Sequence, residues 1–273
     1  MTQHESNTAL VTGASAGIGL DYAHFLAERG WNLVLTARRT ERLDAAADHI
    51  RAKHNITCTV VTADLACREA PVMIMDTLRA NDIHIDALIN NAGYALATSF
   101  ARTDWEHIDD FLNVMVGAVT HLPHLVLPGM LQKGYGRIVN IASLAAFAPE
   151  PIGSLYPSVK RYMVSMSRAI HVETRGTGVH CIATCPGFTW TEFHDVLGMR
   201  AEVSSVPKFL WQNARSVVKE SWRAAEKNRA VHVTGIPNKI MHGLCWLTPH
   251  RLAHGLMPKG VKNRGRHQDE SEK

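Results

Sequence analysis

The sequence contains few cysteines, and their arrangement argues against a disulfide framework and against a structural zinc site. Five cysteines occur in 273 residues, an odd number, and none belongs to a CxxC pair. A disulfide framework needs paired cysteines, and a structural zinc site usually needs closely spaced Cys or His ligands. We therefore expect neither disulfides nor a metal, and a reducing, cytoplasmic environment is the default expectation.

Long apolar runs and a strong net charge are also missing. No run of 18 apolar residues occurs, so we expect no membrane-spanning helix. The first residues, MTQHESNTALVTG, lack the basic and apolar regions of a signal peptide. The formal net charge is only +4, which argues against a nucleic-acid partner. With 46% hydrophobic and 20% charged residues, the composition is that of a globular protein.

Short apolar runs alternate with helix-like segments along most of the chain. Seven runs have the character of buried strands: 8–12, 31–37, 57–65, 84–93, 136–143, 178–187 and 230–235. The segments between them are helical in pattern, including a long one over 104–131 that Pro123 should bend or interrupt. Apolar strands alternating with helices predict an α/β fold, with a parallel sheet covered on both faces. We predict one Rossmann-type, doubly wound domain of about seven strands over residues 1–259.

The last third of the chain is less regular. Residues 188–210 have weak periodicity and several large apolar side chains, which indicates a substrate loop or lid. Residues 236–258 form an apolar helical segment, of which 240–257 would cover a substrate cleft or, as a second interpretation, rest on a membrane surface. Residues 260–273 are charged, and we expect a disordered tail.

The first motif that suggests chemistry is TGASAGIG, which follows the first expected strand. Its glycines, Gly13, Gly17 and Gly19, precede an amphipathic helical segment. Glycines at such a place allow a tight turn, and the backbone N–H groups at the helix start can approach a pyrophosphate. The spacing is GxxxGxG, which differs from the more common GxGxxG fingerprint, so the motif alone is weak evidence for a dinucleotide.

The end of the second expected strand bears on which dinucleotide could bind. Sites selective for NAD place an Asp or Glu about 20 residues after the glycine turn, where it holds the ribose hydroxyls. This sequence has Ala37 there, followed by Arg38 and Arg39. A guanidinium pairs well with a phosphate, so the sequence favours NADP(H) over NAD(H). However, two arginines at a solvent-exposed helix start, with no nucleotide to bind, would give the same sequence pattern.

A serine, a tyrosine and a lysine suggest proton transfer. Tyr156 follows Ser143 by thirteen residues, and Lys160 follows Tyr156 by four. In a helix, the Cβ atoms of residues four apart lie about 5–6 Å from each other on one face. A free phenol has a pKa of about 10, and a nearby ammonium lowers it, so such a tyrosine could exchange a proton near neutral pH. Taken alone, the pattern fits an ordinary amphipathic helix better.

Taken together, these motifs resemble the short-chain dehydrogenase/reductase family. TGASAGIG, Asp64, NNAG (90–93), Ser143, YPSVK (156–160) and PG (186–187) occur in the order and spacing of that family, over residues 8 to about 190. TARR, LPGML, GRIVNIAS and RAVHVTG are most similar to the branch that contains the DltE-like oxidoreductases and the ketoacyl or steroid reductases.

The resemblance implies an enzyme that transfers a hydride between nicotinamide and a hydrophobic carbonyl compound or secondary alcohol. Tyr156 would be the general acid or base, Lys160 would hold the nicotinamide ribose and lower the tyrosine pKa, and Ser143 would hydrogen-bond the substrate oxygen. The resemblance also implies a homodimer or homotetramer. The cofactor NADP(H) would be held by Gly13, Ser15, Gly17, Ile18, Arg38, Asp64, Leu65, Asn90, Ala92, Tyr156, Lys160, Pro186, Gly187, Thr189 and Thr191.

One position departs from the family pattern. The family has an asparagine in its fourth helix that completes a proton relay, and counting back from LPGM places it at Met115. Asn113 lies two residues earlier, about 200° round a regular helix. Either a local bulge brings Asn113 into place, or the relay is missing or rerouted. The second hypothesis for the chain is therefore an NADP(H)-binding sensor or scaffold with little or no catalysis.

Overall fold

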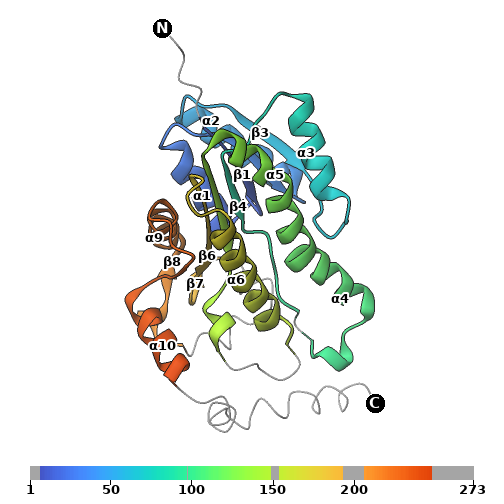
Figure 1. The fold of residues 1–273 in the computed structure, drawn as a ribbon. Helices are drawn as coiled ribbons and strands as arrows, with labels where there is room; N and C mark the ends of the chain where they lie inside the picture. The colour runs from blue at the N-terminus through green and yellow to red at the C-terminus, as the bar shows by residue number, and fades with distance from the viewer. Residues whose placement is uncertain (1–6, 97, 149–153, 193–205, 248–273) are drawn as a thin grey trace.

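One parallel sheet organises the chain. The structure, a computed structural model, describes residues 7–96, 98–148, 154–192 and 206–247 (Figure 1). Seven strands pair in the order β3-β2-β1-β4-β5-β6-β9, and every neighbouring pair is parallel. These strands are β1 (Thr8–Thr12), β2 (Asn32–Ala37), β3 (Cys58–Thr62), β4 (Ala87–Asn90), β5 (Gly136–Ile141), β6 (Val179–Cys185) and β9 (Val231–Val233). The predicted fold class is confirmed.

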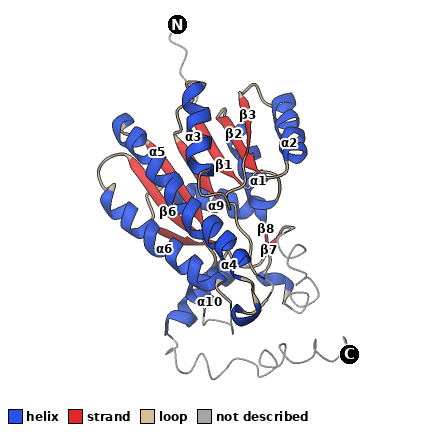
Figure 2. Cartoon of the chain, turned by 90° about the vertical axis from the view of Figure 1, so that its right-hand side faces the viewer, coloured by secondary structure: helices blue, strands red, loops and turns tan. Residues whose placement is uncertain are grey.

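Helices cover both faces of this sheet (Figures 1 and 2). One face carries α1 (Gly17–Ala27), α2 (Thr40–Lys53) and α9 (Ala214–Glu226). The other carries α3 (Ala70–Ala80), α4 (Trp105–Leu112), α5 (Val119–Lys133) and α6 (Tyr156–Glu173). The last described helix, α10 (Ile236–Leu247), lies near the short strands β7 (Thr189–Trp190) and β8 (Gln212–Asn213) at the bottom of Figure 1.

The alternation of side chains along β1 explains the two-sided cover. Ala9 and Val11 are fully buried in the core cluster that contains Trp222 of α9. Leu10, between them, is fully buried in the opposite cluster with Ile74 of α3. Successive side chains of a strand point to opposite faces, so an uninterrupted apolar run requires a helix layer on each side.

The long helical segment predicted over 104–131 is interrupted, but not at Pro123. Pro123 lies inside α5, and the interruption is a π-helical turn over Asn113–Ala118. Proline has no N–H group to donate to the carbonyl four residues earlier. That carbonyl belongs to Val119, and it accepts a hydrogen bond from Asn90 Nδ2 at 3.2 Å. The side chain of Asn90 thus replaces the missing backbone donor, and the helix continues through the proline.

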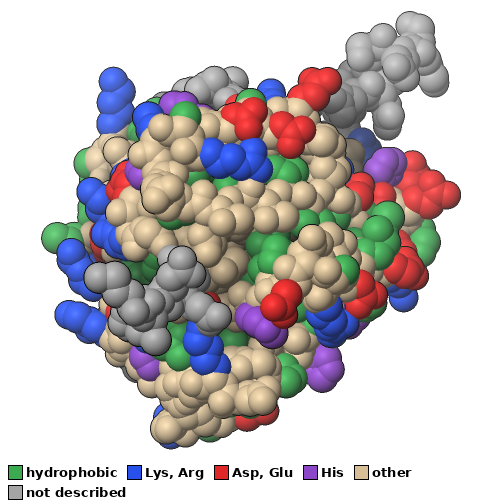
Figure 3. All heavy atoms as spheres, turned by 90° about the horizontal axis from the view of Figure 1, so that it is seen from above, with side chains coloured by type: hydrophobic (Ala, Val, Ile, Leu, Met, Phe, Trp, Pro, Cys, Tyr) green, Lys and Arg blue, Asp and Glu red, His purple; other side chains and the backbone are tan. Residues whose placement is uncertain are grey.

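The helical stretch Trp105–Lys133 also meets a length and hydropathy criterion for crossing a membrane. It spans 29 residues, its most apolar window has a mean hydropathy of 1.5, and 44% of that window is buried. Phe111 and Leu122 from this stretch are fully buried against the sheet. Core helices of soluble proteins pass the same criterion, so the stretch is weak evidence for a membrane span. On the face seen in Figure 3, basic and acidic side chains are interspersed among the described residues.

The C-terminal predictions are partly covered by the structure. Within 188–210, the described residues form β7 and a short 3₁₀ turn over Lys208–Leu210, and β7 pairs in parallel with β8. Sequence analysis did not predict this two-stranded ribbon, whose strands have only two residues each. Residues 193–205, together with 248–258 and the predicted tail 260–273, lie outside the described residues.

Candidate active site

The glycine motif forms a tight turn between β1 and α1. Gly13 and Gly17 have φ values of +64° and +57°, which favour glycine. A Cβ atom on Gly13 would lie 2.9 Å from Ala92 Cα, and one on Gly19 would lie 2.4 Å from the Gly13 carbonyl oxygen. No side chain among the described residues caps the start of α1. The N–H groups of Gly17, Ile18 and Gly19 are therefore at a helix start that suits an anion.

The NNAG motif forms the floor of this turn. Thr12 Oγ1 accepts hydrogen bonds from the backbone N–H groups of Asn91 and Ala92, both at 2.9 Å. Asn91 Nδ2 donates to the carbonyl oxygens of Thr12 and Gly13, at 3.0 and 3.2 Å. Thr12 and Asn91 were absent from the predicted site, although Asn91 stands inside a motif that the sequence displays. They hold the glycine turn against the end of β4.

Asn90, the other asparagine of this motif, has its side chain inside the core. It is 2% exposed, and its Nδ2 donates to Asn140 Oδ1 at 2.8 Å as well as to Val119. Asn140 in turn donates to Ser167 Oγ at 2.9 Å. The amide of Asn90 is thus committed to joining β4, β5 and the helices behind them, and only its backbone remains to line a nucleotide.

Arg39, rather than Arg38, contacts the glycine turn at the end of β2. Arg39 Nη2 donates to Ser15 Oγ at 3.3 Å. Arg38 is exposed, and its charge acts on Tyr94, whose pKa is raised mainly by burial and lowered by Arg38. A pocket at the start of α2 is lined by Arg39, Thr40, Glu41 and Arg42. Both arginines lie at the adenosine end predicted for a 2′-phosphate.

Two further predicted contacts follow β3. The carboxylate of Asp64 is exposed and accepts a hydrogen bond from the Ala66 N–H at 3.0 Å. Leu65 is 7% exposed and belongs to the core cluster beneath α3. Asp64 therefore shapes the loop after β3, whereas the side chain of Leu65 is available mainly to the core.

Ser143, Tyr156 and Lys160 lie at the carboxyl end of β5 and the first turns of α6. Lys160 is 4% exposed, and its Nζ donates to the Ile141 carbonyl oxygen at 2.7 Å. The same Nζ lies 5.5 Å from the centre of the Tyr156 ring. Ser143 Oγ accepts from the Ala145 N–H at 3.1 Å and so caps the short turn Leu144–Phe147. The three predicted catalytic residues thus come together.

Burial is the main cause of the pKa shifts of Tyr156 and Lys160. Burial raises the pKa of Tyr156 to about 12, although a hydrogen bond with Ser143 acts in the opposite direction. Burial lowers the pKa of Lys160 to about 8, with a smaller raising effect from Cys185. The expectation that Lys160 lowers the tyrosine pKa is wrong for this structure, because the desolvation of the phenolate outweighs the lowering effect of the hydrogen bond with Ser143. Tyr156 is therefore a protonated acid at neutral pH.

The segment after β6 connects this group to the glycine turn. The Pro186 carbonyl oxygen accepts from the Leu144 N–H at 2.8 Å, next to Ser143. Thr189 Oγ1 donates to the Gly187 carbonyl oxygen at 3.1 Å. Thr191 lies across from Gly17, since a Cβ atom placed there would be 3.3 Å from the Thr191 side chain. Residues 186–191 thus run from the neighbourhood of Ser143 to the glycine turn.

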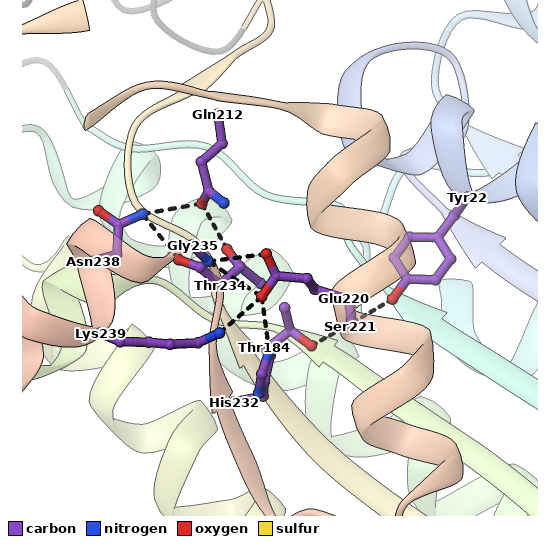
Figure 4. Close-up of polar contacts among 10 residues, drawn as sticks. All are labelled: Tyr22, Thr184, Gln212, Glu220, Ser221, His232, Thr234, Gly235, Asn238 and Lys239. Atoms are coloured by element: carbon purple, nitrogen blue, oxygen red, sulfur yellow. Dashed lines mark hydrogen bonds and ion pairs between the residues drawn. The ribbon is translucent and has the colours of Figure 1, made fainter. Parts of the chain in front are cut away.

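A polar network joins α9, the end of β9 and α10 (Figure 4). Asn238 of α10 is 1% exposed, and its Nδ2 donates to the Thr234 carbonyl oxygen at 3.0 Å. A Cβ atom on Gly187 would lie 2.4 Å from Asn238 Oδ1, so the amide packs directly against this glycine. Glu220 of α9 accepts from Lys239 Nζ at 3.0 Å and thereby ties α9 to α10. Sequence analysis did not single out Asn238 or Glu220.

Aromatic side chains form a wall beside the same segment. The rings of Trp190 and Trp211 stack with centres 4.0 Å apart, and Phe188 lies 5.5 Å from Trp211. Trp190 is 52% exposed and Phe209 is 71% exposed. Exposed aromatic side chains of this size next to a polar group are typical of a site that binds an apolar molecule.

The structure places Met115 in the core beneath the NNAG motif. Met115 is fully buried in the π-helical turn, and a Cβ atom on Gly93 would lie 2.8 Å from its Sδ atom. The bulge that sequence analysis left open does occur. However, Asn113 Nδ2 donates to Asp109 Oδ2 at 3.2 Å, one turn earlier on the same helix. Within the described residues, no cluster of three or more His, Cys, Asp or Glu side chains could hold a metal ion.

Comparison with known proteins gives a consistent result. A family model described as short chain dehydrogenase matches residues 7–200. The very-long-chain 3-oxoacyl-CoA reductase of Anas platyrhynchos is 34% identical over 194 residues, which cover 69% of this chain and 61% of the relative. The inactive hydroxysteroid dehydrogenase-like protein 1 of Homo sapiens is 32% identical over 186 residues, covering 67% of this chain and 56% of the relative. The match thus spans less than two thirds of these relatives.

A solved structure extends the likeness over more of the fold. The short-chain dehydrogenase from Sphingobium yanoikuyae in complex with NADPH superposes with a TM-score of 0.77. It is 30% identical, and the alignment covers 89% of this chain and 96% of that protein.

Proposed function

The chain belongs to the short-chain dehydrogenase family, and on this basis we propose that it is an NADP(H)-dependent oxidoreductase acting on a hydrophobic carbonyl compound or secondary alcohol. The observation that carries the proposal is the half-buried Tyr156 with the buried Lys160 beside Ser143. This pair stands at one end of a segment whose other end reaches the glycine turn. The arrangement can hold a dinucleotide and move a proton at one place.

The residues fit a dinucleotide cofactor. A Cβ atom on Gly13 or Gly19 would collide with the turn itself, so glycine keeps the turn tight, and the start of α1 offers uncapped N–H groups for phosphate oxygens. Ser15 and Arg39 present a hydroxyl and a guanidinium for the 2′-phosphate, with Arg38 nearby in the sequence. The structure of the similar dehydrogenase from Sphingobium yanoikuyae contains NADPH, which supports NADP(H) as the cofactor of this chain. When bound, the cofactor supplies the hydride.

The chain's own residues supply the proton and the orientation. The Tyr156 hydroxyl, protonated at neutral pH, donates its proton to the substrate oxygen in the direction of reduction. The Ser143 hydroxyl donates a hydrogen bond to the same oxygen as negative charge develops there. Lys160, fixed by its bond to the Ile141 carbonyl, stabilises the phenolate that remains and holds the ribose.

The aromatic wall supports a hydrophobic substrate. Phe188, Trp190 and Trp211 gather beside the segment that leads to Ser143 and Tyr156. Apolar pockets with a few convergent polar groups are typical of small-molecule sites. The name of one relative, a very-long-chain 3-oxoacyl-CoA reductase, is in keeping with an apolar carbonyl substrate.

Cofactor choice is tested by removing the two arginines separately. We expect Arg39→Ala to weaken NADPH binding by roughly tenfold, because a charge-assisted hydrogen bond to phosphate contributes about 1.5–3 kcal/mol. NADH has no 2′-phosphate, so its affinity should change little. Fluorescence titration of both nucleotides with wild type, Arg38→Ala and Arg39→Ala checks this. A wild type that prefers NADH would contradict the proposed cofactor.

The second candidate function is an NADP(H)-binding protein with little or no turnover. The observation that favours it is the fully buried Met115, which cannot carry a proton where the family has an asparagine. Because the Ser143, Tyr156 and Lys160 group is assembled, we keep catalysis as the leading proposal.

Replacing Met115 separates the two functions. We expect wild type to reduce apolar ketones with NADPH, and Met115→Asn to raise kcat, because an amide can hold the water that a relay needs. The variant should also unfold more easily, since a buried thioether is exchanged for an amide. Met115→Leu is the matched apolar control and should leave kcat unchanged. Tight NADPH binding without turnover in wild type and Met115→Asn would favour the binding protein instead.

A further inference from the structure

A carboxylate lies among the basic residues that start α2. Glu192 is held by Arg42 Nη1, 3.0 Å from its Oε2 and 3.3 Å from its Oε1. The same Oε2 is 3.7 Å from Arg39 Nη2, the atom that also donates to Ser15 at 3.3 Å. One guanidinium is therefore shared between the glycine turn and the carboxylate of a residue more than 150 positions away in the sequence.

The backbone next to Glu192 is positioned by the glycine turn itself. The side chain of Thr191 lies 3.3 Å from where a Cβ atom of Gly17 would be. Glu192 therefore stands at the edge of the phosphate turn and points toward α2. The side chains of Glu192, Arg39 and Arg42 are each about half exposed, at 52%, 48% and 50%. Their attraction is accordingly modest and sensitive to salt.

We propose that the Glu192 carboxylate competes with the 2′-phosphate of NADP(H) for Arg39, and so sets how strongly the protein prefers NADP(H). The inference rests on the proposed function, because it assumes that Ser15 and Arg39 receive that phosphate. Two anions at one guanidinium repel each other, so the phosphate must displace Glu192 from Arg39 toward Arg42. NAD(H) carries hydroxyl groups at that position and needs no such displacement. Glu192 is then a specificity-determining residue that weakens NADP(H) binding selectively.

The test is a calorimetric titration of wild type and Glu192→Gln with four probes. NADPH and NADH are compared, and 2′,5′-ADP is compared with 5′-AMP, which differs from it only by the 2′-phosphate. We expect Glu192→Gln to bind NADPH and 2′,5′-ADP roughly two- to five-fold more tightly, as for an exposed ion pair. Affinities for NADH and 5′-AMP should stay unchanged, and the gain should shrink at high salt.

A matched control removes one carboxylate from α2 without touching the turn. Asp48 pairs with Arg51 at 2.8 Å on the exposed side of α2, and Asp48→Asn makes the same change in net charge. This control should bind all four probes as wild type does. An equal gain in both variants would overturn the inference, since it would reflect net charge alone.

The outcomes also separate this inference from the proposed function. Unchanged or weaker NADPH binding by Glu192→Gln, with wild type still preferring NADPH, would overturn the role of Glu192 alone. A wild type that binds neither NADPH nor 2′,5′-ADP would overturn the proposed cofactor, and the competition with it. Because Glu192 is half exposed, its replacement should leave the fold intact, and a melting curve verifies this.

Discussion

Tyr156→Phe should lower kcat by about 10²–10⁴, the contribution usual for general acid–base catalysis. The substitution removes only the hydroxyl, so the ring keeps its place beside Lys160 and the packing of α6. NADPH affinity should therefore stay close to that of wild type. Steady-state reduction of apolar ketones, together with NADPH titration, measures the two effects separately.

Tyr162 provides the matched control on the same helix. Its hydroxyl lies 2.8 Å from Thr120 Oγ1, and the residue is 39% exposed, on the outer side of α6. Tyr162→Phe also deletes one phenol hydroxyl, but away from Ser143 and Lys160, and should keep full turnover. Undiminished turnover of Tyr156→Phe across a broad carbonyl panel would show that the proton comes from elsewhere.

Gly19→Ala should impair both folding and nucleotide binding. The added Cβ atom would lie 2.4 Å from the Gly13 carbonyl oxygen and 2.5 Å from Asn91 Nδ2, so the turn must move. Overpacking of this kind costs about 1–3 kcal/mol in the free energy of unfolding. Moving the N–H groups that we propose to bind the phosphates should also weaken NADPH binding by about tenfold or more. Chemical denaturation and NADPH titration measure the two losses.

Gly129→Ala is the control for the same chemical change. Gly129 lies inside α5, and beyond its neighbours and the backbone of its own helix no atom comes within 4 Å of an added Cβ atom. Alanine favours a helix interior over glycine by about 0.8–1.0 kcal/mol. This variant should be slightly more stable than wild type and bind NADPH normally. If Gly19→Ala is also as stable as wild type and binds NADPH normally, the close approach of Gly19 to Gly13 contributes neither to stability nor to nucleotide binding.

The fold was predictable because burial on both faces makes the strands of a parallel sheet apolar throughout. Each of the seven expected apolar runs contains a strand of the main sheet. The ends of the strands were less predictable. Of the apolar run 84–93, only Ala87–Asn90 forms a strand, β4. After Asn90, the chain turns to bond Thr12, and apolarity carries no information about that hydrogen-bonded turn.

That Ser143, Tyr156 and Lys160 lie together was predictable, but the geometry of the candidate site was not. Whether Arg38 or Arg39 faces Ser15 depends on how the chain leaves β2, which neighbouring basic residues do not reveal. Burial also reversed the expected shift of the Tyr156 pKa, because the depth of Tyr156 depends on the whole fold around it. Likewise, the continuation of α5 through Pro123 is supported by a bond between Asn90 and Val119, 29 positions apart.

The position of β1 inside the sheet, between β2 and β4, has a consequence for when the nucleotide turn forms during folding. β1 is made first, yet Leu10 pairs with Leu88 of β4, far along the chain. Closing such long loops is entropically expensive, and proteins dominated by distant contacts fold slowly. The glycine turn gains its floor from Asn91 only once β4 has docked. A nucleotide held by that turn would thus recognise the assembled chain alone, and its binding would raise the free energy of unfolding.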